Sequence, residues 1–156
     1  MQFTDFSQLD LARLPTPCFV VDEVAIERNL KILHEVEQRS GAKVLQALKA
    51  FSMFSLAPLS KQYLSGTCAS GVHEARLGEQ HYGGEVHVFS VAFTENDLID
   101  LFEFSNHIVF NSCSQLLRFE KLCKAALEER PDLRFGLRIN PQHSEGAVPL
   151  YDPCAP

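Results

Sequence analysis

Short apolar runs alternate with amphipathic segments along the chain. The runs at 44–48, 66–71, 85–91, 107–110 and 133–139 are typical of buried parallel strands, and a shorter run at 18–21 predicts an additional first strand. Apolar residues at helical spacing predict helices over 23–39, 54–64, 73–81, from residue 94 onward and over 112–130. Asp22, Thr94 and Ser112 are suited to begin three of these helices as N-caps. The alternation favours an α/β fold with a parallel sheet.

The strand ends favour a barrel over a doubly wound sheet. Neither GxGxxG nor GxxxxGK[ST] occurs, although a nucleotide-binding doubly wound sheet usually has such a glycine-rich turn. The carboxyl ends of the predicted strands carry polar residues instead, namely Lys49, Ser70, Ser90, Asn111 and Arg138 with Asn140. Active sites of (β/α)8 barrels lie at these carboxyl ends, and such barrels have eight strands and about 250 residues. We therefore predict a partial (β/α)8 TIM-type barrel with about five of its eight strands.

Composition and charge exclude several classes of protein. The 156 residues include 14 basic and 20 acidic side chains, without clusters of lysine and arginine, so no nucleic-acid partner is expected. No apolar run approaches the roughly 20 residues of a membrane span, and the first residues do not resemble a secretory signal. Five cysteines without a CxxC pair indicate reduced thiols and a cytoplasmic location. The six histidines lack HxxxH and HExxH spacing, so we predict no metal site.

Lys49 is the strongest candidate for chemistry. It ends the apolar run 44–48, and burial there would lower the pKa of its ammonium, as a Schiff-base lysine requires. The alternative is a lysine whose amine reaches solvent from a strand end. The small residues of 66–71 leave room for a flat cofactor, or serve only a tight turn. Arg138 is suited to hold an anionic oxygen, or to form an ordinary ion pair.

Six segments carry a resemblance to a known family. The chain resembles the N-terminal part of the carboxynorspermidine (carboxyspermidine) decarboxylases, which belong to the alanine-racemase-like, fold-type III enzymes dependent on pyridoxal 5′-phosphate (PLP). The segments are TPCFVVDE (16–23), ALKAFSMFS (47–55), YLSGTCASGVHEARLG (63–78), GGEVHVFSVAF (83–93), IVFNSCSQL (108–116) and LRFGLRINP (133–141).

The resemblance implies a cofactor, a reaction and site residues. Lys49 would carry PLP and be the catalytic residue, while Ala47, Ser70 and Arg138 would lie beside the cofactor. Thr67 stands where ornithine and diaminopimelate decarboxylases usually have an aspartate, which argues against those relatives. A polyamine-type substrate and a homodimer are implied for the full-length enzyme, and this chain alone is expected to be inactive.

The resemblance also divides the chain into two parts. Residues 1–22 would contain a strand of a second, C-terminal β-domain, and residues 23–156 would form the truncated PLP-binding barrel. The closing segment 145–156 resembles the loop after the fifth barrel strand. Three alternatives remain: another fold-type III decarboxylase or racemase, a non-catalytic PLP-binding fragment, and a barrel fragment whose lysine is only solvated.

Overall fold

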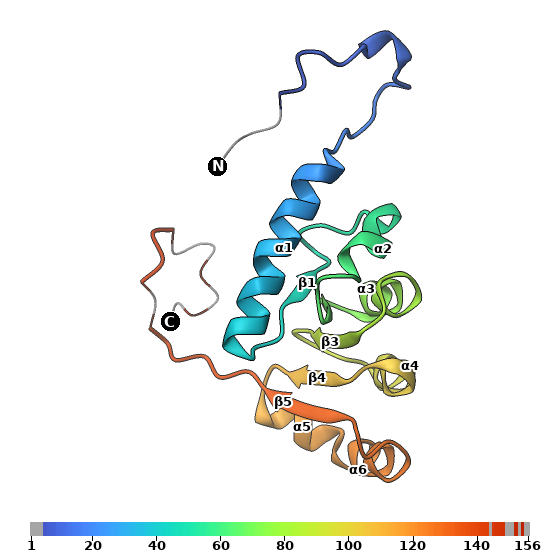
Figure 1. Ribbon diagram of the computed structural model, residues 1–156. Helices are drawn as coiled ribbons and strands as arrows, with labels where there is room; N and C mark the ends of the chain where they lie inside the picture. Colours follow the sequence, from blue (N-terminus) through green and yellow to red (C-terminus); the bar gives the residue numbers. More distant parts are fainter. Residues whose placement is uncertain (1–4, 144, 149–151, 153, 155–156) are drawn as a thin grey trace.

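Five parallel strands form a single sheet in sequence order (Figure 1). The computed structural model describes residues 5–143, 145–148, 152 and 154. The strands are β1 (Leu45–Ala47), β2 (Gly66–Ala69), β3 (Glu85–Phe89), β4 (His107–Phe110) and β5 (Arg134–Leu137). Each strand pairs with the next one in the sequence, as in a barrel wall, whereas a doubly wound sheet reverses its strand order at a switch point. The predicted α/β fold with five parallel strands is confirmed.

Three of the helices begin at their predicted caps. Asp22 accepts a hydrogen bond from the Ala25 N–H at 3.0 Å, Thr94 forms a capping box with Asp97, and Ser112 caps the helix that follows it. The helices are α1 (Glu23–Ser40), α2 (Ala57–Ser60), α3 (Val72–Leu77), α4 (Glu95–Phe104), α5 (Cys113–Arg118) and α6 (Glu120–Glu129). Short 3-10 helices η1 (Leu11–Arg13) and η2 (Phe54–Leu56) and the π-helical turn η3 (Gly78–Tyr82) complete the elements.

Three predicted helices differ from the structure. The helix expected over 73–81 continues beyond α3 as the π-helical turn η3. The helix expected over 54–64 is limited to η2 and the single turn of α2, and a hydrogen-bonded turn follows it. The helix expected over 112–130 is divided into α5 and α6 at Phe119, whose φ of −105° and ψ of 13° are not helical. Phe119 is only 7% exposed, so burial of its ring in the core offsets the interruption.

The hydrophobic core lies between one face of the sheet and helices α3, α4 and α6. Figure 1 shows these three helices on the same side of the strands. Ile108 and Phe110 of β4 point into the core and are fully buried, whereas His107 and Val109 point to the opposite face and are half-buried. Leu98 and Leu101 of α4 are also fully buried in this core.

The π-helical turn η3 packs closely on β2. A Cβ atom added at Gly78 would stand 2.3 Å from the Thr67 hydroxyl oxygen, so only glycine allows this approach. Thr67 is fully buried on the helical side of the sheet. Its neighbours Cys68 and, in register, Ala47 point to the other face. Thr67 therefore does not share a face with Ala47, the predicted cofactor contact.

The strand predicted at 18–21 is not formed. These residues form no regular element and pair with no strand of the described chain, and Phe19 is 93% exposed. A β-prone segment requires a partner for its backbone groups, and the described residues offer none here. The division at residue 22 remains a prediction. Part of the closing segment, including Pro149, Pro153 and Pro156, lies outside the described residues. Within the described residues, no helix has the length and apolarity needed to cross a membrane.

Candidate functional site

The four predicted site residues lie at the carboxyl edge of the sheet. Ala47 is the last residue of β1, and Lys49 follows it by two positions. Ser70 directly follows β2, and Arg138 directly follows β5. Because all five strands are parallel, their carboxyl ends meet at one edge, which is the edge that carries active sites in barrels of this type.

Lys49 stands in a turn beyond β1 and not within the buried strand. The Ala50 and Phe51 N–H groups both donate to the Ala47 carbonyl oxygen, at 3.0 and 3.2 Å, so the chain turns as soon as the strand ends. The Lys49 side chain is exposed, while the neighbouring Leu48 is 2% exposed. The expectation of a buried lysine is therefore wrong for this chain. Lys49 is instead exposed to solvent, as the alternative interpretation predicted, and a ligand can reach its amine.

Ser70 belongs to a loop that is closed by a carboxylate. Its backbone N–H donates to Glu74 Oε2 at 2.7 Å, and its side chain is exposed. Glu74 lies in the first turn of α3, where the helix dipole also favours a negative charge. Sequence reasoning did not assign this contact. The signal was a glutamate at the third helical position, which commonly reaches back to a backbone N–H before the helix.

Arg138 is oriented by residues at the carboxyl ends of β3 and β4. Its Nη1 donates to Asn111 Oδ1 at 3.0 Å, and its guanidinium carbon lies 6.0 Å from the centroid of the Phe89 ring. The Asn111 N–H donates in turn to Gln115 Oε1 at 3.0 Å, and Gln115 Nε2 donates to the Val91 carbonyl oxygen at 3.3 Å. Asn111 was recognised as a polar strand end, whereas the roles of Phe89 and Gln115 were not predicted.

The sheet brings only part of the predicted site together. Ala47, Lys49 and Ser70 lie at the ends of the adjacent strands β1 and β2, whereas Arg138 follows β5, the strand at the opposite side of the sheet. Three hollows of the described chain lie elsewhere, one of them about 240 Å³ in volume and lined by Leu9, Asp10, Arg13 and Leu14. Another of about 270 Å³ lies between α4 and α6, and one of about 170 Å³ lies between α1, β1 and α2. None of the four predicted site residues lines any of these hollows.

Known proteins resemble this chain along almost its whole length. No protein-family model matches the sequence. Over 143 residues, 92% of the chain, it is 40% identical to the carboxynorspermidine/carboxyspermidine decarboxylase of Herminiimonas arsenicoxydans. The resemblance to carboxynorspermidine decarboxylases is confirmed. The chain is also 37% identical over 144 residues to a carboxyaminopropylagmatine decarboxylase of Synechocystis, again over 92% of its length.

The structural comparison agrees with the sequence comparison. The fold superposes on the crystal structure of carboxynorspermidine decarboxylase from Campylobacter jejuni, solved with norspermidine, with a TM-score of 0.75 and 32% identity. The match covers 86% of this chain and 35% of that one. The chain likewise spans 37% and 36% of the Herminiimonas and Synechocystis proteins, which is about a third of the length of its relatives.

Proposed function

We propose that this chain is part of a PLP-dependent decarboxylase that converts carboxynorspermidine or carboxyspermidine into norspermidine or spermidine. The observation that carries the proposal is the 40% identity to a decarboxylase of that name over 92% of the chain. The fold adds support, because the polar residues at the carboxyl edge stand where barrel enzymes perform their chemistry.

The residues at the carboxyl edge fit PLP in their chemistry. Lys49 offers an exposed primary amine, which would hold the aldehyde carbon of the cofactor. Arg138 offers a guanidinium for an anionic oxygen, and the short side chains of Ala47 and Ser70 leave space for a flat ring. When bound, PLP supplies an electron sink for the electron pair left by the departing carboxylate. The role of this chain is then to hold and orient the cofactor.

The same proposal extends to the substrate, the assembly and the compartment of the enzyme. A polyamine-type small molecule is the proposed substrate, a homodimer the proposed assembly, and the cytoplasm the proposed compartment. The chain alone is proposed to be inactive, because a third of a barrel enzyme leaves the far side of the site unbuilt.

A chimera tests the proposed reaction in a complete enzyme. This chain replaces the matching 143 residues of the Campylobacter jejuni decarboxylase, to which it is 35% identical. We expect the purified chimera to release norspermidine from carboxynorspermidine, and Lys49→Ala to abolish that turnover. Lys43→Ala, which changes an exposed lysine ahead of β1, is the matched control and keeps it. A folded chimera without turnover, or a Lys49→Ala chimera with normal turnover, contradicts the proposal.

A second candidate substrate is favoured by the Synechocystis relative. Its name assigns carboxyaminopropylagmatine to that protein, at 37% identity to this chain. The same chimera, assayed with all three carboxylated polyamines, separates the candidates by their kcat/KM values. Diaminopimelate, ornithine, arginine and alanine belong in the same panel, because turnover of one of these amino acids alone would favour another fold-type III enzyme. A chimera that binds PLP without any turnover would favour a non-catalytic fragment.

A further inference from the structure

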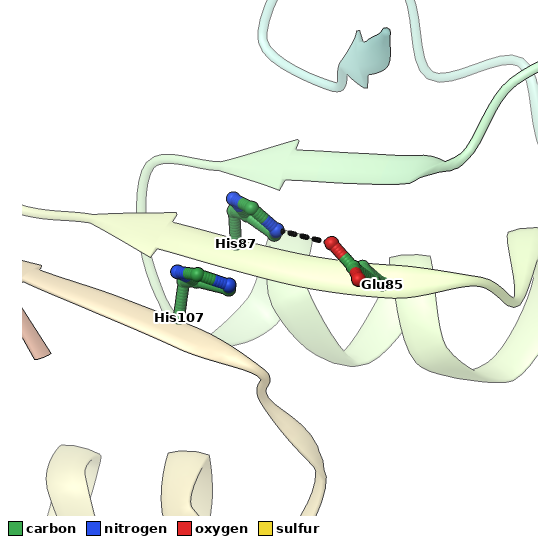
Figure 2. A group of neighbouring side chains, drawn as sticks. All are labelled: Glu85, His87 and His107. Atoms are coloured by element: carbon green, nitrogen blue, oxygen red, sulfur yellow. Dashed lines mark hydrogen bonds and ion pairs between the residues drawn. The ribbon is translucent and has the colours of Figure 1, made fainter. Parts of the chain in front are cut away.

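Three metal-ligating side chains meet on the open face of the sheet, away from the carboxyl edge. Glu85 is the first residue of β3 and His87 is the third, so both point to the same face. His107 is the first residue of β4 and pairs in register with His87. Figure 2 shows the three side chains extending side by side from these two neighbouring strands.

The contacts among the three residues are close. His87 Nε2 and Glu85 Oε2 are 2.9 Å apart, and the two imidazole rings stack with centroids 4.1 Å apart at 22°. One ligand atom from each residue lies within 4.8 Å of the others. The side chains of His87 and Glu85 are 24% and 27% exposed in the described chain.

We propose that Glu85, His87 and His107 bind a divalent transition-metal ion of the zinc class, with water in the remaining position. Two imidazoles and one carboxylate are a known ligand set for Zn²⁺ and for related ions, whereas Mg²⁺ and Ca²⁺ prefer oxygen ligands throughout. Metal–ligand bonds of about 2.0–2.2 Å require ligand atoms closer together than 4.8 Å. Binding would therefore require the side chains to rotate so that the three ligand atoms come closer together.

Two neighbouring features bear on metal affinity. The Lys43 ammonium forms an ion pair with Glu85 Oε1, so a bound cation must compete with it for the carboxylate. Burial, and then the neighbouring His87, lowers the pKa of His107, which favours the neutral imidazole that metal ions require. The Lys43 ion pair therefore weakens the site, and removing it should strengthen binding.

The position of the cluster assigns the ion a structural role. Glu85 and His107 begin their strands, at the opposite end of the sheet from Lys49, Ser70 and Arg138. An ion held by both strands would fasten β3 to β4. The HxxxH and HExxH spacings describe ligands on one helix, so their absence predicted no metal site. The two histidines of this cluster come from neighbouring strands and are 20 residues apart in the chain. The inference does not depend on the proposed decarboxylase activity.

Metal titration of the 156-residue chain tests the proposal. We expect Zn²⁺ to raise the melting temperature, and Co²⁺ to give visible d–d bands without the near-ultraviolet charge-transfer band of a cysteine ligand. Changing either histidine, as His87→Asn or His107→Asn, should weaken Zn²⁺ binding at least about tenfold. His73→Asn, at an exposed histidine outside the cluster, is the matched control and should bind as the unmodified chain does.

Lys43→Gln provides a test that does not remove a ligand. It frees the Glu85 carboxylate, so Zn²⁺ should bind several-fold more tightly, and circular dichroism confirms that the fold is retained. The proposal is overturned if both His→Asn variants bind Zn²⁺ as tightly as the His73→Asn control. It is equally overturned if Lys43→Gln fails to tighten binding, if millimolar Mg²⁺ displaces Zn²⁺, or if Co²⁺ shows only the thiolate band.

Discussion

The two faces of the sheet differ in burial although they share the same strands. On the helical face, Val86, Val88, Ile108 and Phe110 are at most 2% exposed and form the core with α3, α4 and α6. On the open face, the alternate residues His87, Phe89, His107 and Val109 are only half-buried. Because successive side chains of a strand point to opposite faces, one set of residues packs in the core and the other set is free for chemistry. The helical face holds the fold together, and the open face carries polar groups at both of its ends.

The largest predicted effect breaks the packed face. Phe110→Ala removes a fully buried ring that contacts Phe93 and Phe135, so we expect a loss of about 3–5 kcal/mol in the free energy of unfolding. Phe89→Ala removes the same ring from the open face, where it is half-buried, and should cost less than half as much. Urea denaturation of both variants measures the difference. Equal losses would show that the two faces contribute alike.

The next effect concerns the hydrogen bonds that link α1 to the segments preceding β1 and β2. Glu37 accepts hydrogen bonds from the Ser65 hydroxyl at 2.6 Å and from the Val44 N–H at 2.8 Å. These bonds lower the pKa of the Glu37 carboxyl, chiefly through Ser65. Glu37→Gln should cost about 1 kcal/mol of stability at neutral pH, because one accepting oxygen is replaced by a donor.

The hydrogen bonds of Glu37 also predict that the stability of the fold depends on pH. A carboxyl whose pKa is lower in the folded state stabilises above its unfolded pKa, and the stabilisation is lost as the pH falls through the folded value. The melting temperatures of the unmodified chain and of Glu37→Gln should therefore converge in acid. Glu35→Gln, on the exposed side of α1 with a 3.6 Å pair to Arg39, should differ little from the unmodified chain at any pH. A difference for Glu37→Gln that persists in acid would contradict this explanation.

A smaller effect tests whether the Arg138 side chain is held in place at the carboxyl edge. The hydrogen bond from Arg138 to Asn111 links the ends of β5 and β4. A double-mutant cycle with Arg138→Met and Asn111→Ala should give a coupling energy of about 0.5–1.5 kcal/mol. The pairing of Lys124 and Glu120 on the exposed surface of α6 provides the comparison, and its coupling should be smaller. A coupling near zero for Arg138 and Asn111 would mean that the guanidinium is not held in this position.

Local sequence patterns correctly predicted the features that depend on residues close together in the chain, namely the strands and the helix starts. The apolar runs located all five strands of the sheet, and Asp22, Thr94 and Ser112 located three helix starts, because caps and periodicity are local properties. Parallel strands also place the residues after them at one edge, so Lys49, Ser70 and Arg138 could be assigned to that edge from the sequence.

Features that depend on distant residues were missed or wrong. The strand at 18–21 needs a partner that the described chain does not offer, and Lys49 is exposed because a turn follows β1 at once. The break at Phe119 reflects burial of a ring in the core, which helical periodicity does not reveal. The cluster of Glu85, His87 and His107 arises from strand register, and no spacing within one segment could have indicated it.

The assignment of Lys49 is tested most directly by locating the lysine that holds PLP. In the chimera, borohydride reduction of the PLP-loaded protein followed by peptide mapping locates the lysine that carries the cofactor. We predict a single modified peptide containing Lys49, at one cofactor per chain, and loss of that modification in Lys49→Arg. Modification of Lys43 or of another lysine, with Lys49 unmodified in an active enzyme, would contradict the assignment of the carboxyl edge as the active site.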